Sequence, residues 1–225
     1  PYVLTILPTD KYEVAQTDLD RSTGVPYPTE KVEFQFPKLQ TATLSNGAKV
    51  VLAQRKGVPL IELNFQFDFG YAQENNDELG YTNFMMAMLN EGTKKYSSLE
   101  FDEVLDSLGS NLGFGSGLDT SVASLSSLKA NLSETLDLAK EALINPTFPE
   151  KEIERIKKET LAGIIQEENR PASIAYRNIG KLLYGEAHPY GKPLTGSGIS
   201  KTISAITRKN IMDVHSRAIN SAHLT

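Results

Sequence analysis

Apolar and polar side chains alternate along residues 58–69 of the 225-residue chain, in the run VPLIELNFQFDF. The polar members of the run are Glu62, Asn64, Gln66 and Asp68. A period of two is the pattern of an extended strand with different side chains on its two faces. The run therefore predicts a strand over Leu60–Phe69. It also rules out a membrane-spanning helix here, which would need about 20 consecutive apolar residues.

Further strands are expected on both sides of this run. Asn46-Gly47 lies between two alternating stretches in TATLSNGAKVVLAQR (residues 41–55), and this dipeptide is the strongest short signal for a β-hairpin. Two later stretches, SNLGFGSG (residues 110–117) and TSVASLSSLKA (residues 120–130), are strand candidates as well.

Helical periodicity appears between and after these strands. An opening helix is predicted by apolar residues at i, i+3, i+4, i+7 and i+8, namely Tyr81, Phe84, Met85, Met88 and Leu89. Further helix starts are expected at Ser97-x-x-Glu100 and Thr147-x-x-Glu150, which are patterned like capping boxes, and at Asn131-x-x-Glu134. Pro171 opens a helix to about Tyr184, and a last helix runs from Thr207 to about Ile219.

The order of elements predicts an α+β fold, in which an antiparallel-rich sheet is covered by helices on one face. Residues 1–36 lack sustained periodicity and are interpreted as an N-terminal linker or arm, with a short strand at YVLTIL (residues 2–7). Residues 37–225 form the compact domain. Because the chain opens on Pro1 and stops within a new apolar segment, we expect a domain truncated near its last strands.

Composition narrows the possible functions. The formal net charge of −5 argues against a nucleic-acid-binding protein, because phosphate contacts need clustered lysine and arginine. The chain has no cysteine, so disulfides and thiolate metal sites are excluded. No G-x-S-x-G nucleophile elbow and no Gly-rich phosphate loop occurs.

The ionisable residues give little sign of a catalytic site. The three histidines, His188, His215 and His223, lack ligand spacing, so we expect each to be solvent-exposed or locally bonded. The long helix interleaves acidic and basic residues, which predicts a solvated, salt-bridged face that Glu167 and Glu168 continue. Its acidic members are Glu150, Glu152, Glu154 and Glu159.

The stretch GYTNFMMAMLNEGT (residues 80–93) resembles the active helix of the inverzincin zinc peptidases: pitrilysin, insulin-degrading enzyme and mitochondrial processing peptidase. That helix carries H-x-x-E-H within G-x-x-H-x-x-E-H-M-x-x-x-G-T. Gly80, Met88, Gly92 and Thr93 match the frame. Other stretches are similar to later parts of the family, including NGAKVVLAQR, FDFGYAQE, NPTFPEKEIERIKKETLAGIIQEENRP and HPYGKPLTG. The resemblance covers about residue 40 to the end and implies a processing-peptidase-like metallohydrolase fold.

The resemblance also implies that the catalytic groups are missing. It places Asn83 at the first histidine, Met86 at the general-base glutamate and Ala87 at the second histidine. Alignment of the long helix places Gly163 at the third ligand, a glutamate. Zinc needs nitrogen and carboxylate ligands, and its bound water needs a base. We therefore expect no metal, no cofactor and no catalysis from this domain, although the parent protein could be a zinc metallopeptidase through another half.

A function follows by analogy with the family, whose members pair an active half with a degenerate half around a peptide chamber. The chain would pair with an active homologous half, on the same chain or as a separate subunit, and would contact an unfolded peptide. In active halves the peptide adds to a sheet edge as a strand. The corresponding edge here is Leu112, Gly113, Phe114, Gly115 and Ser116, which departs from the Asn-Ala common at Gly113-Phe114.

Two other functions stay open. The chain could be a scaffold or assembly subunit without peptide contact, as core subunits of a respiratory complex are in this family. The other alternative is a hydrolase with a site relocated to His188 and Glu186. The isolated fragment could also form a homodimer. The sequence does not determine the compartment; bacterial two-repeat members, which are often exported, favour the periplasm by analogy.

Overall fold

The computed structural model describes residues 22, 24, 33, 35–55, 57–220 and 224. The strand expected at residues 2–7 and His223 lie outside these residues. The chain divides into two units, Pro1–Phe36 and Pro37–Thr225, and everything below concerns the second unit. The interpretation of residues 1–36 as a linker or arm stays a prediction.

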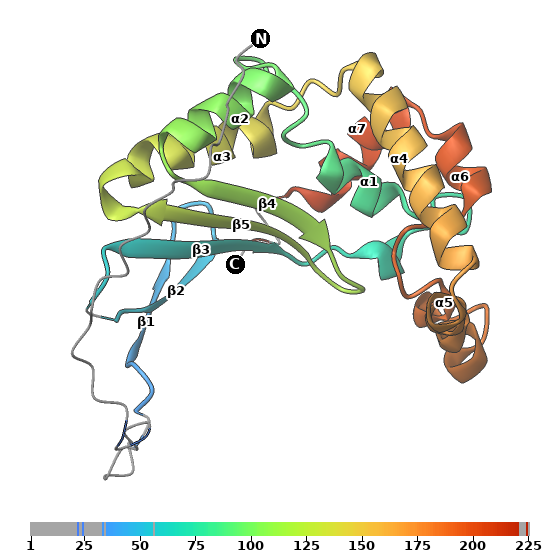
Figure 1. Cartoon of the computed structure of the whole chain (residues 1–225), viewed down its shortest axis with the longest axis horizontal. Helices are drawn as coiled ribbons and strands as arrows, with labels where there is room; N and C mark the ends of the chain where they lie inside the picture. Colours follow the sequence, from blue (N-terminus) through green and yellow to red (C-terminus); the bar gives the residue numbers. More distant parts are fainter. Residues whose placement is uncertain are drawn as a thin grey trace. The chain divides into compact units, whose positions relative to one another are not determined.

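Two antiparallel sheets form the β part of this unit (Figure 1). The larger sheet has the order β3-β5-β4, built from β3 (Leu60–Phe67), β4 (Asn111–Ser116) and β5 (Ser121–Leu128). The smaller sheet is the predicted hairpin of β1 (Leu39–Thr43) and β2 (Lys49–Ala53) around Asn46-Gly47. Gly47 has a φ of 88°, a backbone conformation in which a residue with a side chain would be strained. Together with the helices, these sheets confirm the predicted α+β class.

The alternation in β3 has the predicted consequence. Phe65 pairs with Ala123 and Leu63 with Leu125, so the apolar residues of β3 and β5 share one face. That face is covered by α2 (Ser98–Ser107) and α3 (Leu132–Ile144), which lie side by side over the sheet in Figure 1. The buried residues of this layer are Phe101, Leu105, Leu112, Leu125, Leu138, Ala139 and Ala142. β3 ends at Phe67, two residues before the predicted end, where the chain turns toward η1 (Tyr71–Gln73).

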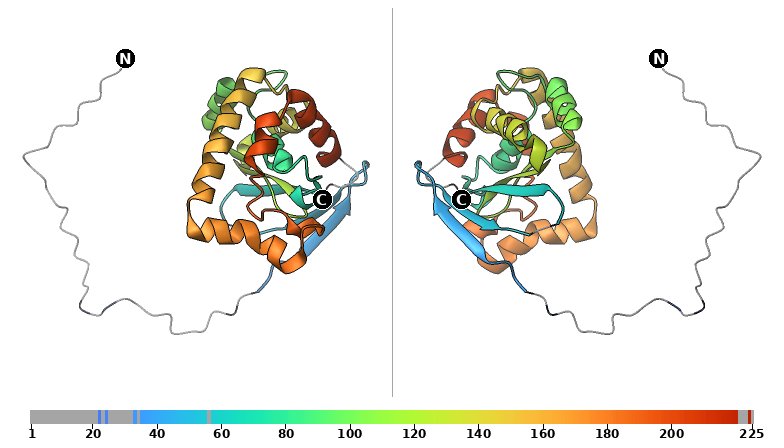
Figure 2. Two further views of the ribbon diagram at one scale, coloured as in Figure 1. Left: turned by 90° about the vertical axis from the view of Figure 1, so that its right-hand side faces the viewer. Right: turned by 90° about the vertical axis from the view of Figure 1, so that its left-hand side faces the viewer.

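A second group of helices packs at one end of the sheet around α1 (Tyr81–Ala87) (Figures 1 and 2). This group contains α4 (Glu150–Glu168), α6 (Ser200–Ala205) and α7 (Arg208–Ala218). The buried side chains of α1 lie in its core together with Ile164, Ile203 and Ile211. Helix α5 (Pro171–Tyr184) follows α4 at the margin of the group, and two short 3₁₀ helices, η2 (Lys129–Asn131) and η3 (Pro189–Gly191), complete the unit.

The expected helix caps have mixed outcomes. Ser97 and Glu100 form the predicted capping box, in which the Ser97 amide donates to the Glu100 carboxylate at 2.9 Å. Helix α3 begins at Leu132, directly after Asn131, as predicted; the Asn131 side chain does not cap it, and its Nδ2 donates to the carbonyl of Leu108 at 2.8 Å. The Thr147 box is absent too, because α4 begins at Glu150 directly after Pro149. Within the part of the chain described here, no helix is both long and apolar enough to cross a bilayer.

Candidate functional site

The start of α1 is held by a very close backbone approach. Gly80 precedes the helix with a φ of 91°, and a Cβ placed there would lie 2.8 Å from the carbonyl oxygen of Ser197 and from the Cα of Gly198. Any larger residue would be strained by the backbone angle and would push residues 195–198 away. The close packing between α1 and this loop therefore requires a glycine at residue 80, which is one of the residues that match the family motif.

A buried carboxylate caps the same helix end. Glu74 is 6% exposed, and its two carboxylate oxygens accept hydrogen bonds from the amides of Gly80 (2.8 Å) and Thr82 (2.6 Å). Burial raises the pKa of Glu74, and the two amide donors oppose that rise. Glu74 therefore provides acceptors for the N–H groups of Gly80 and Thr82, which have no carbonyl partner within the helix.

Asn83, at the position of the first histidine in the resembling motif, is engaged at both ends of its amide. Its Nδ2 donates to the carbonyl of Gly196 at 3.1 Å, and its Oδ1 accepts from the amide of Ser116 at 3.1 Å. The approach to the loop is tight, since a Cβ on Gly196 would lie 2.3 Å from Nδ2. Asn83 thereby joins the end of β4 to the loop of residues 195–198.

The other three positions offer no ligand for a metal. Met86 is 0% exposed, with its thioether in the core. Ala87 is exposed and carries only a methyl group. Gly163, on α4, is half-buried, and no atom lies within 4 Å of where its Cβ would be. These four positions do not fit the nitrogen and carboxylate ligands that zinc requires. They offer the hydrogen-bonded amide of Asn83, a buried thioether, a methyl group and, at Gly163, only a hydrogen atom. Among the described residues, no group of three His, Cys, Asp or Glu is placed to hold a metal ion.

The strand proposed to meet a peptide is an edge of the larger sheet. β4 pairs with β5 on one side, and no strand of the described residues pairs with its other side. The Ser116 amide points to that outer side, because it donates to Asn83. Backbone direction repeats every second residue, so the amides of Leu112 and Phe114 point outward as well. Their side chains pack into the core, whereas Gly113 and Gly115 leave the opposite face of the strand bare.

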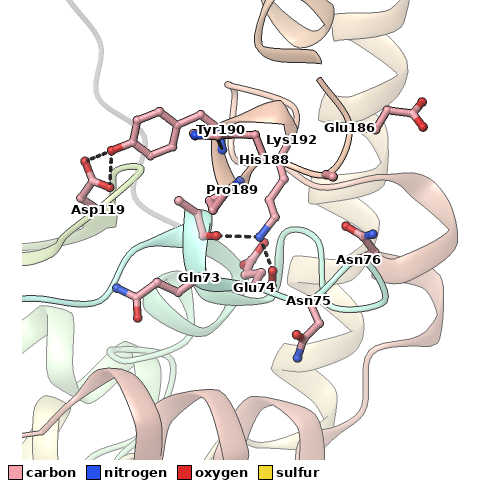
Figure 3. Close-up of a pocket in the computed structure, with 12 residues that line it drawn as sticks. Gln73, Glu74, Asn75, Asn76, Asp119, Glu186, His188, Pro189, Tyr190 and Lys192 are labelled. Carbon is pink, nitrogen blue, oxygen red and sulfur yellow. Dashed lines mark hydrogen bonds between the residues drawn. The ribbon is translucent and has the colours of Figure 1, made fainter. Parts of the chain in front are cut away.

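A polar cavity of about 800 Å³ opens beside η1, and Figure 3 shows its lining. The Lys192 ammonium points inward and donates to the carbonyls of Ala72 (2.7 Å) and Glu74. Burial lowers the pKa of Lys192. The Tyr190 hydroxyl donates to Asp119 at 2.8 Å, and this bond raises the pKa of Tyr190. These contacts tie the loop of residues 186–192 to η1 and to the β4–β5 turn.

The two residues considered for a relocated hydrolase both line this cavity but do not act on each other. Glu186 pairs with Lys181, and Figure 3 shows its carboxylate directed away from His188. His188 accepts a hydrogen bond at Nδ1 from the amide of Tyr190 at 3.0 Å and stacks on Tyr184. The locally bonded role predicted for His188 is therefore confirmed.

His215 has a different environment from the one predicted. It is half-buried, and its Nε2 donates to the carbonyl of Leu143 in α3 at 2.9 Å. Its ring also meets Phe148 edge-on at 5.6 Å. The expectation of an exposed or locally bonded side chain was wrong, because the tertiary packing of α7 against α3 places this ring against a carbonyl 72 residues away.

The acidic face of α4 has a similar mixed outcome. Arg155 binds Glu152 and Glu159 on the helix surface, as the interleaved charges predicted. Glu167 instead pairs with Arg177 at 2.5 Å, and the Arg177 side chain is only 8% exposed. Arg177 also donates to Ser197 (2.8 Å) and to the carbonyl of Gly198 (2.7 Å). Sequence reasoning missed this cluster, since only an arginine among the apolar residues of α5 hinted at a buried partner.

A family model described as "Insulinase (Peptidase family M16)" matches residues 49–196. The chain belongs to this family. It is 24% identical over 181 residues to an "Uncharacterized zinc protease" of Rickettsia felis, covering 80% of this chain and 43% of that protein. It is 26% identical over 140 residues to the "Non-peptidase homolog YmxG" of Helicobacter pylori, covering 60% of this chain and 32% of that protein.

A solved structure described as the "peptidase M16 inactive domain" of Pseudomonas fluorescens superposes with a TM-score of 0.78 at 32% identity. The match covers 83% of this chain and 45% of that one. The chain therefore has a degenerate insulinase-family fold, and it spans less than half the length of these relatives. The predicted family resemblance is confirmed.

Proposed function

We propose that the chain is a non-catalytic domain that pairs with an active homologous zinc-peptidase half and helps to enclose a peptide. The proposal is carried by the state of the four positions where active members hold zinc and the general base. Asn83 is committed to two hydrogen bonds, Met86 is buried, and Ala87 and Gly163 have no donor atoms. The contacts of Gly80, Glu74 and residues 195–198 nevertheless hold the start of α1 in place.

A zinc titration followed by calorimetry tests the first part of this proposal. We expect no stoichiometric binding, because the four positions supply no imidazole and no carboxylate. Binding of one zinc ion per chain would contradict it, unless substitution of Asn83, Ala87 and Gly163 left the binding unchanged and so placed the ion elsewhere. Cleavage of an unfolded peptide by the purified chain, abolished by His188→Ala, would instead support the relocated hydrolase.

The peptide contact is proposed for the outer edge of β4, over Leu112–Ser116. The outward amides of Leu112 and Phe114 support it, because an added strand gains its affinity from such groups. Hydrogen exchange with an extended, uncharged peptide as the probe should slow exchange at these two amides, in the chain alone or paired with an active half. If exchange at both amides is unchanged in both samples, the edge does not take up peptide.

The scaffold function is the second candidate, and one observation favours it. Asn83 already holds the Ser116 amide, which shortens the edge that a peptide could use. A domain that binds an active half yet leaves every β4 amide unprotected by peptide would be a scaffold. Co-purification with the active half, measured alongside exchange, separates the two candidates.

A further inference from the structure

Helix α5 presents its apolar side chains to solvent. Leu182 is 81% exposed, Leu183 is 68% exposed and Tyr176 is 54% exposed. We define the α5 stripe as Ala172, Ala175, Tyr176, Ile179, Leu182 and Leu183. These positions follow the spacing i, i+3, i+4, i+7, i+10 and i+11, so they lie on one side of the helix. All six are exposed.

The other side of α5 attaches the helix to the domain through polar and small residues. Arg177 binds Glu167, Ser197 and the Gly198 carbonyl, as described above. At Gly180, an added Cβ would lie 2.4 Å from the carbonyl oxygen of Tyr190. A surface helix normally buries its apolar face. In α5 the polar face is docked, so the α5 stripe has no partner among the described residues.

The stripe is accessible at the margin of the domain, where Figure 2 shows α5 along the outside of the helical group. From these exposures, the stripe offers on the order of 500 Å² of surface, at the upper end of the patches that monomeric proteins show. Two such surfaces together approach the roughly 1,000 Å² that marks the lower limit of a specific interface. The area suits a weak dimer better than an obligate one.

The stripe is also complementary to itself. Its small residues, Ala172 and Ala175, lie at the beginning of α5, and its large residues, Leu182 and Leu183, lie at the end. In an antiparallel pair related by a two-fold axis, the small end of one helix faces the large end of the other. No residue of the stripe is charged, so a copy brings no like charge to the contact.

We propose that the α5 stripe is a contact surface for a second copy of this chain, with the two α5 helices packed antiparallel about a two-fold axis. Ala172 of one copy lies against Leu183 of the other, and Tyr176 lies against Ile179. This inference does not rest on the proposed function, because it concerns two copies of the same chain.

Sedimentation velocity across micromolar concentrations tests the association. We expect a monomer–dimer equilibrium that strengthens as salt is added, because each copy carries a net charge of −5 and salt screens their repulsion. The double variant Leu182→Glu with Leu183→Glu should weaken dimerisation at least about tenfold. Leu99→Glu is the matched control, since Leu99 is 69% exposed on α2 and should leave the equilibrium unchanged.

Cross-linking tests the orientation without removing the whole stripe. The chain has no cysteine, so Ala172→Cys and Leu183→Cys each create a single reactive thiol. In the antiparallel pair the two copies of residue 172 lie about 16 Å apart along the axis, so neither variant should form a disulfide dimer alone. An equal mixture of the two variants should form one upon oxidation.

Three results would overturn the inference. They are a monomer at every concentration, open-ended aggregates in place of a dimer, and equal cross-linking of each single-cysteine variant with and without the other. A strictly monomeric chain that binds an active half through α5 would assign the stripe to that half. Circular dichroism and thermal unfolding of the glutamate variants confirm that a lost dimer is not a lost fold.

Discussion

The amide of Ser116, at the end of β4, donates a hydrogen bond to the Asn83 side chain of α1, 33 residues away. Asn83 thereby connects two parts of the backbone. The same side chain holds the Gly196 carbonyl, 113 residues away. Asn83 therefore contributes to the cohesion of the domain by neutral hydrogen bonds.

Replacing Asn83 with alanine should destabilise the domain by about 1–3 kcal/mol, because two partly buried backbone groups lose their partner. Chemical denaturation measures the loss, and hydrogen exchange should become faster at Ser116. Asn83→Asp is the control for the Ser116 bond, because it keeps an acceptor for that amide while it replaces the donor to Gly196 with a carboxylate oxygen. Equal exchange at Ser116 in wild type and Asn83→Ala would show that the bond is unimportant.

Gly163→Ala should stabilise the domain by about 0.5–1 kcal/mol, since the residue lies inside α4 and its Cβ would enter open space. Gly180→Ala, on the adjacent helix α5, should instead destabilise the domain, because its Cβ would meet the Tyr190 carbonyl at 2.4 Å. Thermal unfolding compares the two variants. Opposite signs are expected, and a loss of stability in Gly163→Ala would mean that the space near α4 is filled.

Arg177→Met should cost about 3 kcal/mol, because it removes the buried cation that pairs with Glu167, which keeps only the Ser197 hydroxyl as a donor, and it removes the Arg177 donor to the Gly198 carbonyl. Urea denaturation measures this loss. Arg177→Lys should restore only part of the stability, since an ammonium lacks the planar group that reaches Glu167, Ser197 and Gly198 together. Full recovery with lysine would reduce the role of Arg177 to its charge alone.

His215 should make stability depend on pH. Burial lowers the pKa of His215 below its ordinary value of 6.5, and the bond to Leu143 only partly offsets this effect. The unfolded chain therefore takes up the proton first, so stability is complete above about pH 6.5 and falls as the pH drops toward the folded pKa.

Thermal unfolding on both sides of this window measures the effect. His215→Gln should flatten the pH dependence across it. If the slope persists unchanged in His215→Gln, another group causes it.

The strand at residues 60–67 and the helix of residues 171–184 follow from local patterns. The alternation around Phe65 requires only that one face be buried, and Pro171 begins α5 where predicted. The capping box of Ser97 and Glu100 is also local, because its members are three residues apart. These features can be predicted because they depend only on residues that are close in the sequence.

The identity of the family frame was likewise readable from the order of Gly80, Met88, Gly92 and Thr93. The failed cap at Thr147 marks the limit of this reasoning. Helix α4 begins only after Pro149, and Asn131 begins α3 as predicted while its side chain donates to the Leu108 carbonyl, 23 residues away. A side chain with two available partners is decided by whichever the fold brings closer.

The sequence by itself determined the elements and their order, because residue types and periods are local properties. It also determined that residues 83, 86, 87 and 163 carry neither an imidazole nor a carboxylate. Only the tertiary structure decided that Asn83 binds Ser116 and Gly196, that Arg177 is buried against Glu167, and that α5 turns its leucines outward. Those outcomes depend on which distant segments meet, and the free energy of burial is set by the whole packed domain.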